Sequence, residues 1–191
     1  MRPAFETDPG QFGEAIIRSA PELNKFVSFA PRYVESDREH RDGGRRAAEE
    51  YFAMLRDQFA RKEKVSFVVE RRGVFLGVFS VHTINEVTRS GEFSCWVDSR
   101  HAGRGVTSAA NRCWIDWAFE TVGFIRISAF TALDNIASRK MTERAGFRLV
   151  GVSRKRLLVG SEFRDAHEWE MTGDEWRVWR DSRGPLHGAS Q

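Results

Sequence analysis

One stretch of this chain constrains its fold more than any other: Glu92 to Ala110, which reads EFSCWVDSRHAGRGVTSAA. Its first residues, Glu92 to Val97, alternate in character as a β-strand does. A short turn with two glycines follows, and a helical pattern begins at Val106. The first N–H groups of a helix have no intrahelical partner and point out of its end. A strand, a glycine turn and a helix in this order therefore predict a place where an anion can bind.

The residues of the turn strengthen this prediction. Gly103 and Gly105 have no Cβ atom that would hold a phosphate away from the backbone, and glycine adopts positive φ angles readily. Arg100 and Arg104 add positive charge to the same turn. An anionic ligand is expected here.

Two familiar glycine motifs do not fit the turn. A dinucleotide-binding fingerprint needs a third glycine where Ser108 stands, and an acidic residue about 20 positions further on. A Walker loop needs a lysine after its last glycine, whereas this chain continues Gly105-Val106-Thr107. On these residues alone, an ordinary strand-to-helix connection without a ligand stays open.

Length and composition fit one α/β domain. The chain has 191 residues, with 30 basic and 27 acidic side chains, so it is long enough to bury a core and too balanced in charge for a nucleic-acid-binding surface. Cys95 and Cys113 lack CxxC spacing, and the 5 histidines lack metal-ligand spacing. No signal peptide and no apolar run of about 18 residues is visible. We expect a cytoplasmic protein with no metal, no nucleic acid and no membrane contact.

Helices and strands can be placed along most of the chain from periodicity and capping residues. Asp8 is expected to cap the first helix, and Pro21 to follow its end at Ala20. Helices are expected over residues 9–20, 45–62, 136–145 and from 106 onward. Strands are expected over 65–70, 74–85, 92–97, 124–132, 147–152, 154–159 and 163–171.

Two segments between the first two helices are expected to be irregular. Leu23 to Pro31 is rich in aromatic residues and is either a loop packed on the core or one wall of a substrate cleft. Val34 to Gly44 is charged and is expected to be an exposed, mobile connection. Residues 1–180 are expected to form a single domain, and residues 181–191 a flexible tail.

Three local motifs occur in a recognisable order. The first is the turn Arg100-His101-Ala102-Gly103-Arg104-Gly105. The second is Asn135-Ile136-Ala137-Ser138-Arg139 followed by Gly146-Phe147, and the third is Phe163-Arg164-Asp165. Together they resemble the GNAT superfamily of acyl-CoA N-acyltransferases, in its RimJ/RimL-type branch. The resemblance spans roughly Arg2 to Thr172.

The resemblance implies a fold and a co-substrate. The fold is a mixed α/β architecture in which a twisted sheet of about six or seven strands has helices on both faces. Two central parallel strands are expected to splay at Val97 to Asp98. Acetyl-CoA would place its pyrophosphate on the glycine turn and its pantetheine arm along the preceding strand. The residues implied at acetyl-CoA are Cys95, Trp96, Val97, Arg100, Gly103, Arg104, Gly105, Val106, Thr107, Asn135, Arg139 and Lys140. For Arg139 and Lys140, a solvated helix face is the alternative.

The implied chemistry is attack of a neutral amine on a thioester. At pH 7 roughly one α-amino group in six is neutral, but only about one lysine side chain in 2500, so a base is needed. Glu92 matches the acidic position that begins this strand in RimJ/RimL-type members, which implies a general base. Asp98 is the alternative base, because it lies in the same period-two register. Many superfamily members protonate the departing thiolate with a tyrosine where this chain has Thr142; the RimJ/RimL type has a serine instead, here Ser138.

The acceptor cannot be read from the sequence. Members of the RimJ/RimL type acetylate protein N-termini, polyamines, amino acids, peptides and antibiotics. The resemblance therefore implies an N-acetyltransferase that acts on a primary amine of a peptide N-terminus or of a small molecule; a homodimer is left open. The competing hypothesis is a non-catalytic acyl-CoA-binding regulatory module. Such a module should lack the base carboxylate, so the presence of Glu92 favours an enzyme.

Overall fold

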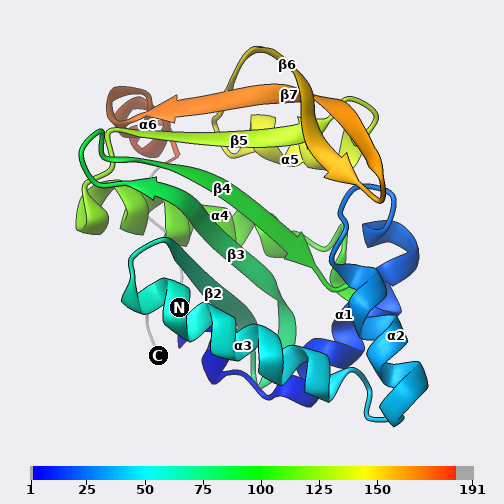
Figure 1. The fold of residues 1–191 in the computed structure, drawn as a ribbon. Helices are drawn as coiled ribbons and strands as arrows, with labels where there is room; N and C mark the ends of the chain where they lie inside the picture. Colours follow the sequence, from blue (N-terminus) through cyan, green and yellow to red (C-terminus); the bar gives the residue numbers. More distant parts are fainter. Residues whose placement is uncertain (1, 184–191) are drawn as a thin grey trace.

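A seven-stranded sheet forms the centre of the molecule (Figure 1); the computed structural model describes residues 2–183. The strand order is β1-β2-β3-β4-β5-β7-β6. The strands are Arg2–Pro3 (β1), Lys64–Arg71 (β2), Val74–Asn85 (β3), Ser90–Val97 (β4), Arg126–Ala132 (β5), Arg148–Val159 (β6) and Glu162–Thr172 (β7). Strands β4 and β5 pair in parallel, and the other described pairs are antiparallel. The expected mixed α/β sheet is confirmed.

Helices cover both faces of this sheet (Figure 1). They are Pro9–Leu23 (α1), Ala30–His40 (α2), Arg45–Ala60 (α3), Val106–Asp116 (α4), Ile136–Arg144 (α5) and Gly173–Asp181 (α6), with a π-helical turn at Trp117–Val122 (η3) and 3-10 turns at Ala4–Glu6 (η1) and Ser99–His101 (η2). None of the described helices is long and apolar enough to cross a membrane.

Two buried clusters hold the layers together. On one face, Phe12 of α1 and Phe52 of α3 pack in the same cluster as Val78 of β3. On the other face, Trp114 of α4 stacks on Phe93 of β4 with ring centroids 4.0 Å apart. Because side chains alternate along a strand, neighbouring residues of β4 face these two clusters in turn. Phe93 and Cys95 therefore face the cluster under α4, whereas Trp96 faces the cluster of α1 and α3.

The structure corrects the expectations for the first helices. The first helix passes through Pro21 and ends at Leu23, because a proline near the end of a helix removes only one of its last hydrogen bonds. The expected mobile connection from Val34 to Gly44 is wrong over most of its length, since α2 runs to His40. Ala30 and Tyr33 are buried at helical spacing, which gives α2 one packed face.

The later strands also differ from their predicted bounds. The strand expected from Phe124 begins at Arg126, and the two strands expected over 147–159 are the single strand β6, whose register shifts between Ser153 and Leu157. A β-bulge of this kind adds residues to one strand without ending it. Most of the expected tail, from residue 184 onward, lies outside the described residues.

The two parallel strands part earlier than expected. Their pairing covers only Ser90–Phe93 of β4 and Arg126–Ala129 of β5, and the strands then diverge (Figure 1). The separation therefore begins after Phe93 and not at Val97 to Asp98. Twist between neighbouring strands carries their ends apart. Residues 94–97 of β4 are left without a backbone partner on the β5 side among the described strands.

Candidate functional site

The glycine turn exposes the start of α4. Gly103 has φ +74° and Gly105 has φ +79°, a region that favours glycine. A Cβ atom at either residue would meet no atom within 4 Å, so no packing demand of the protein explains these glycines. The amide of Ala109 makes the first helical bond, to the carbonyl of Gly105 at 3.2 Å. The amides of residues 106–108 therefore point out of the open end of the helix.

Two arginines surround this opening. Arg100, Arg104, His101 and Val74 line a hollow of about 390 Å³ next to the turn. Both guanidinium groups are always charged at neutral pH. Open amides with two guanidinium groups beside them make a donor set that fits the pyrophosphate of acetyl-CoA.

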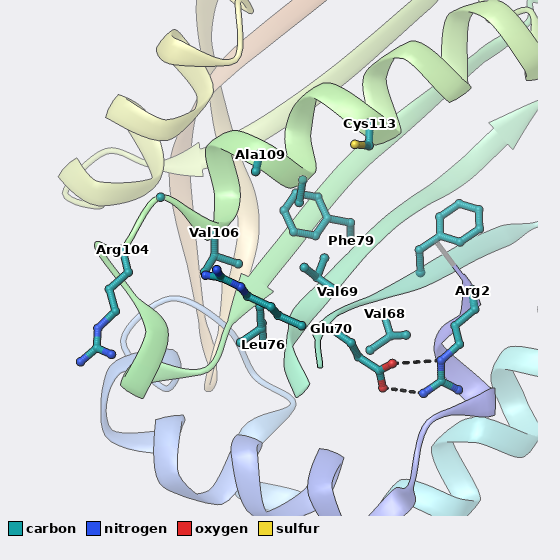
Figure 2. A pocket seen from close by; sticks show the side chains of 14 residues that line it. Arg2, Val68, Val69, Glu70, Leu76, Phe79, Arg104, Val106, Ala109 and Cys113 are labelled. Carbon is teal, nitrogen blue, oxygen red and sulfur yellow. Dashed lines mark hydrogen bonds and ion pairs between the residues drawn. The ribbon is translucent and has the colours of Figure 1, made fainter. Parts of the chain in front are cut away.

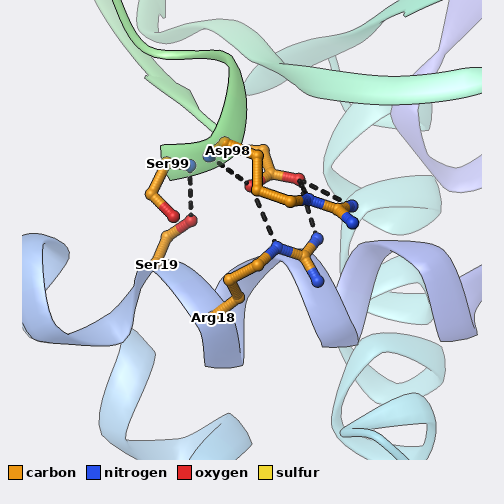
Figure 3. A network of polar contacts seen from close by, with 5 residues as sticks. Arg18, Ser19, Asp98 and Ser99 are labelled. Atoms are coloured by element: carbon orange, nitrogen blue, oxygen red, sulfur yellow. Dashed lines mark hydrogen bonds and ion pairs between the residues drawn. The ribbon is translucent and has the colours of Figure 1, made fainter.

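Asp98 anchors the turn to α1 (Figure 3). Its fully buried carboxylate accepts two hydrogen bonds from Arg18, at 3.1 and 2.7 Å, and one from the amide of Arg100 at 3.0 Å. The amide of Ser99 donates to the hydroxyl of Ser19 at 2.9 Å. Burial opposes ionisation of Asp98, but these hydrogen bonds and the two guanidinium charges hold its pKa below the usual range. A carboxylate so strongly engaged is a weak base.

The last residues of β4 turn their side chains into the protein. Cys95 packs against the cluster under α4, whereas Trp96 packs on Phe12 of α1 with ring centroids 5.6 Å apart. Burial raises the pKa of the Cys95 thiol to about 12, so no thiolate is available at neutral pH. What Cys95, Trp96 and Val97 offer on the β5 side is unpaired backbone, which can pair with an amide-bearing arm.

The start of α5 carries the second motif. The side chain of Asn135 caps the helix by accepting a hydrogen bond from the amide of Ser138 at 3.0 Å. The Ser138 side chain is half-buried, and its hydroxyl bonds to no described residue. Thr142 is buried and its hydroxyl donates to the carbonyl of Ser138 at 3.0 Å. Thr142 is thus occupied, and Ser138 has a hydroxyl that is free to act.

Arg139 and Lys140 lie exposed on the same helix. Arg139 pairs with Glu143 one turn later, at 3.3 Å. An exposed pair of this kind is weak and leaves the guanidinium free to meet a phosphate. Both the solvated-face and the phosphate-binding interpretations are compatible with this placement.

Glu92 lies beside the point where the two parallel strands part. It faces His82 of β3 and Ser128 of β5 in the sheet register. Its carboxylate pairs with Arg156, and its Oε1 lies 3.9 Å from Nε2 of His82. Burial raises the pKa of Glu92, although Arg156 opposes that shift. Burial, together with the positive charges of Lys64 and Arg156, lowers the pKa of His82 to about 4, so this imidazole is neutral at pH 7.

Arg156 is a site residue that the sequence did not reveal. It lies in the bulged part of β6, directly after Lys155, which has φ +51°. The amide of Lys155 donates to Asp165 at 2.8 Å, and this bond holds the bulge. The bulge directs the Arg156 guanidinium over the ring of Phe130, 4.1 Å from its centroid. Asp165 of the third motif was the one sequence feature related to this bulge. It did not indicate that the bulge would direct the Arg156 side chain toward Glu92.

The β6–β7 hairpin is fastened to the segment between α1 and α2. Arg164 donates to Asp134 at 2.6 Å and to the carbonyl of Lys25 at 3.0 Å. The hydroxyl of Ser28 donates to the carbonyl of Leu158 at 2.7 Å. The third motif therefore positions the aromatic segment, Leu23 to Pro31, against the hairpin. Whether this segment forms a wall of the acceptor site stays a prediction.

A separate cavity of about 700 Å³ lies between α4 and strands β2 and β3 (Figure 2). Its walls are mainly apolar and include Phe67, Phe79 and Ala109, with the Arg2–Glu70 ion pair at its edge. It reaches the glycine turn only at Arg104, Gly105 and Val106. Neither Glu92 nor Ser138 lines it, so this cavity is not where these two residues could act.

Most of the residues predicted to contact acetyl-CoA lie at the carboxyl ends of β4 and β5 or directly after them. Strands β4 and β5 run in the same direction, so the glycine turn after β4 and Asn135 after β5 lie at corresponding ends. Glu92 lies in the paired part of β4, two residues before the unpaired part begins. The open helix end and the half-buried carboxylate of Glu92 thus lie apart along β4. Within the described residues, no group of three or more His, Cys, Asp and Glu side chains is close enough to hold a metal.

Comparison with known sequences gives one family. Residues 1–148 match the family model described as "Acetyltransferase (GNAT) domain". The Bacillus subtilis (strain 168) protein named "Putative ribosomal N-acetyltransferase YdaF" is 27% identical over 169 residues, which cover 88% of each chain. The "Spermidine N(1)-acetyltransferase" of Escherichia coli (strain K12) is 23% identical over 116 residues, which are 61% of this chain and 60% of that protein.

Solved structures share the fold. Mycobacterium smegmatis RimJ in complex with CoA-disulfide aligns with a TM-score of 0.80 at 23% identity, over 91% of this chain and 81% of that chain. The microcin C7 self-immunity acetyltransferase MccE, in complex with acetyl-CoA and AMP, aligns with a TM-score of 0.77 at 16% identity, over 89% of each chain.

Proposed function

The chain belongs to the GNAT acetyltransferase family, and we propose that it transfers the acetyl group of acetyl-CoA to the α-amino group of a peptide or protein. That it is an acetyl-CoA-dependent N-acetyltransferase follows from the family and its relatives. The observation that carries the finer proposal is Glu92, a half-buried carboxylate beside the parting of β4 and β5. A base in this place can serve an amine that meets the co-substrate between the two strands.

Acetyl-CoA supplies the acetyl thioester, and the chain supplies its binding groups. The glycine turn from Gly103 to Thr107, with the open amides at the start of α4 and the guanidinium groups of Arg100 and Arg104, holds the pyrophosphate. The unpaired backbone of Cys95 to Val97 holds the pantetheine arm. Asn135 lies near the arm, and Arg139 and Lys140 reach toward the adenosine phosphates. This assignment is supported by the glycines that no internal packing requires and by the free edge of β4.

Glu92 accepts the proton that the attacking amine loses. The N–C bond forms while the C–S bond of the thioester breaks, and the departing thiolate takes a proton delivered through the hydroxyl of Ser138. Burial raises the pKa of Glu92 toward neutrality, and a base works best when its pKa approaches the working pH. The hydroxyl of Ser138 is available for its role, since no described residue binds it. Asp98 is left as the anchor of the turn.

An α-amino group depends less on a general base than a lysine side chain does. Roughly one such group in six is already neutral at pH 7, against about one lysine side chain in 2500. The relative with 88% coverage of both chains is named as a ribosomal N-acetyltransferase, which points to protein termini. A spermidine-type acceptor is the second candidate, because another relative carries that name.

A thiol-release assay with acetyl-CoA and a panel of amines tests the proposal. The panel contains a peptide with a free N-terminus, the same peptide with a blocked N-terminus and a free lysine, and spermidine. We expect release above background hydrolysis with the free N-terminus and not with the blocked peptide. Release with spermidine alone would contradict the proposed acceptor class. Acetyl-CoA binding without release by any amine would instead support the regulatory module.

A further inference from the structure

Arg156 forms an ion pair with Glu92, the carboxylate that is proposed to act as the base. Its Nη2 donates to Oε2 of Glu92, and its guanidinium covers the ring of Phe130. Its side chain is 39% exposed, and its remaining N–H groups bind no described residue. The guanidinium therefore has free donors that solvent or a ligand can reach.

An amine that approaches Glu92 must share this carboxylate with Arg156 or displace the guanidinium from it. An arginine stays charged under all ordinary conditions, so displacement leaves a cation without its partner. A charge-assisted hydrogen bond is lost at that moment unless the incoming molecule carries an anion. An acceptor with a carboxylate near its amine restores the lost pair.

The surrounding charges disfavour the opposite kind of acceptor. Lys64 lies in the same row of the sheet as His82 and Glu92, and its amine reaches Tyr51 at 3.2 Å. A second positive charge on the acceptor would meet both Lys64 and Arg156. Glu168, the other carboxylate near Glu92, accepts a hydrogen bond from Ser153. Directly beside Arg156, an anionic group of the acceptor is attracted, whereas a cationic group in the same place is repelled.

We propose that Arg156 is an anion-binding subsite of the acceptor site, and that the preferred acceptor carries a carboxylate close to its reactive amine. This inference rests on the proposed function and narrows its acceptor. Two kinds of molecule share this chemistry: a peptide with an acidic residue near its N-terminus, which belongs to the proposed acceptor class, and a free α-amino acid, which lies outside it.

The test compares acetyl transfer to matched acceptors. Peptide amides that differ only in their second residue, which is aspartate, asparagine or lysine, test whether the acceptor is an acidic peptide. A comparison of free alanine with alanine amide tests whether the acceptor is a free amino acid. The variants are Arg156→Gln, Arg156→Lys and the control Arg154→Gln, which removes the same charge from an exposed residue of the same strand that binds no described residue.

For the wild type we expect kcat/KM about tenfold higher for the aspartate peptide than for the asparagine peptide, mainly through KM; this is the scale of one hydrogen bond to a charged group. Arg156→Gln should bring the ratio close to one. Its transfer to the asparagine peptide should also change, because losing the guanidinium lets burial raise the pKa of Glu92 further, so the readout is the ratio within each variant. Arg156→Lys should retain part of the ratio, and Arg154→Gln all of it. A preference for free alanine over its amide, lost in Arg156→Gln, would assign the subsite to amino acids.

Three results would overturn the inference: no preference for a carboxylate in either acceptor pair, a preference that survives in Arg156→Gln, or an equal loss for all acceptors in that variant. The last result would mean that Arg156 only supports the fold. Transfer to peptides without any such preference would leave the proposed function intact. Absence of transfer to every amine would contradict the proposed function and this inference together.

Discussion

The glycine turn is built in the opposite way to the group of Glu92, His82 and Arg156, here called the Glu92 cluster. The turn consists of consecutive residues whose backbone amides are the proposed binding groups, so its chemistry is local. The cluster joins side chains from separate strands; Arg156 and Glu92 are 64 positions apart in the sequence. The turn thus depends on backbone conformation, and the cluster depends on strand register and on a bulge. A backbone site tolerates many side chains around it, whereas a side-chain site can change its ligand with one substitution.

The largest expected effect on acetyl-CoA binding comes from a substitution in the turn. In Gly105→Asp, the added Cβ and carboxylate would lie where the pyrophosphate is proposed to bind; two like charges about 4 Å apart repel by about 4 kcal/mol at an effective dielectric constant of 20. We expect acetyl-CoA affinity to fall by at least about 100-fold in calorimetry.

A matched control exists at the far end of the same helical segment. Gly123 also has a positive φ, of +77°, and a Cβ there also meets no atom within 4 Å. Gly123→Asp therefore introduces the same backbone strain and the same charge away from the turn, and should leave the affinity unchanged. Equal affinity losses in both variants would show that strain, and not the anion site, explains the effect.

A smaller effect tests how the turn is joined to α1. Asp98→Asn removes the buried partner of Arg18, and breaking such a pair costs about 3 kcal/mol in unfolding free energy. Because the pKa of Asp98 is lowered in the folded state, this stability is present above its ordinary pKa of about 4 and disappears as the pH falls through the folded value. Denaturant unfolding at pH 7 and pH 3 measures the difference between the two proteins. A difference that does not narrow at pH 3 would argue against the ionised pair as its source.

The sequence predicted the parts of the fold that local patterns determine. The strand, the glycine turn and α4 were found because alternation, two glycines and helical spacing follow one another directly. The helix α2 was missed because its charged residues resemble a loop, while its packed face rests on only a few side chains such as Ala30 and Tyr33. Pro21 was expected to follow the end of the helix because proline disrupts a helix interior. Near the last turn it removes only one backbone hydrogen bond, so the helix continues to Leu23.

In the candidate site too, the features that depend on contacts between distant residues could not be predicted from the sequence. Asp98 lay in register with Glu92 and could not be told from it until the structure placed Arg18 against it, 80 positions away in the sequence. Arg156 could not be predicted, since its direction follows from Lys155 at positive φ and from the bond to Asp165. Pairings of this kind depend on tertiary packing, which a single sequence does not display.

The pH dependence of kcat/KM for Glu92→Gln, with a verified acceptor, tests the central claim most directly. The groups that face Glu92 are His82, Arg156 and Glu168. Because the pKa of His82 is lowered to about 4, this imidazole is neutral near pH 7, and comparison with Glu92→Gln separates the part of the acidic limb that Glu92 contributes. Because burial raises the pKa of Glu92, its limb should lie above the ordinary glutamate range. The account predicts a loss of roughly 10²–10⁴ in the variant, smaller at high pH where more amine is neutral, with acetyl-CoA affinity unchanged. An unchanged profile would contradict the account and remove Glu92 from the mechanism.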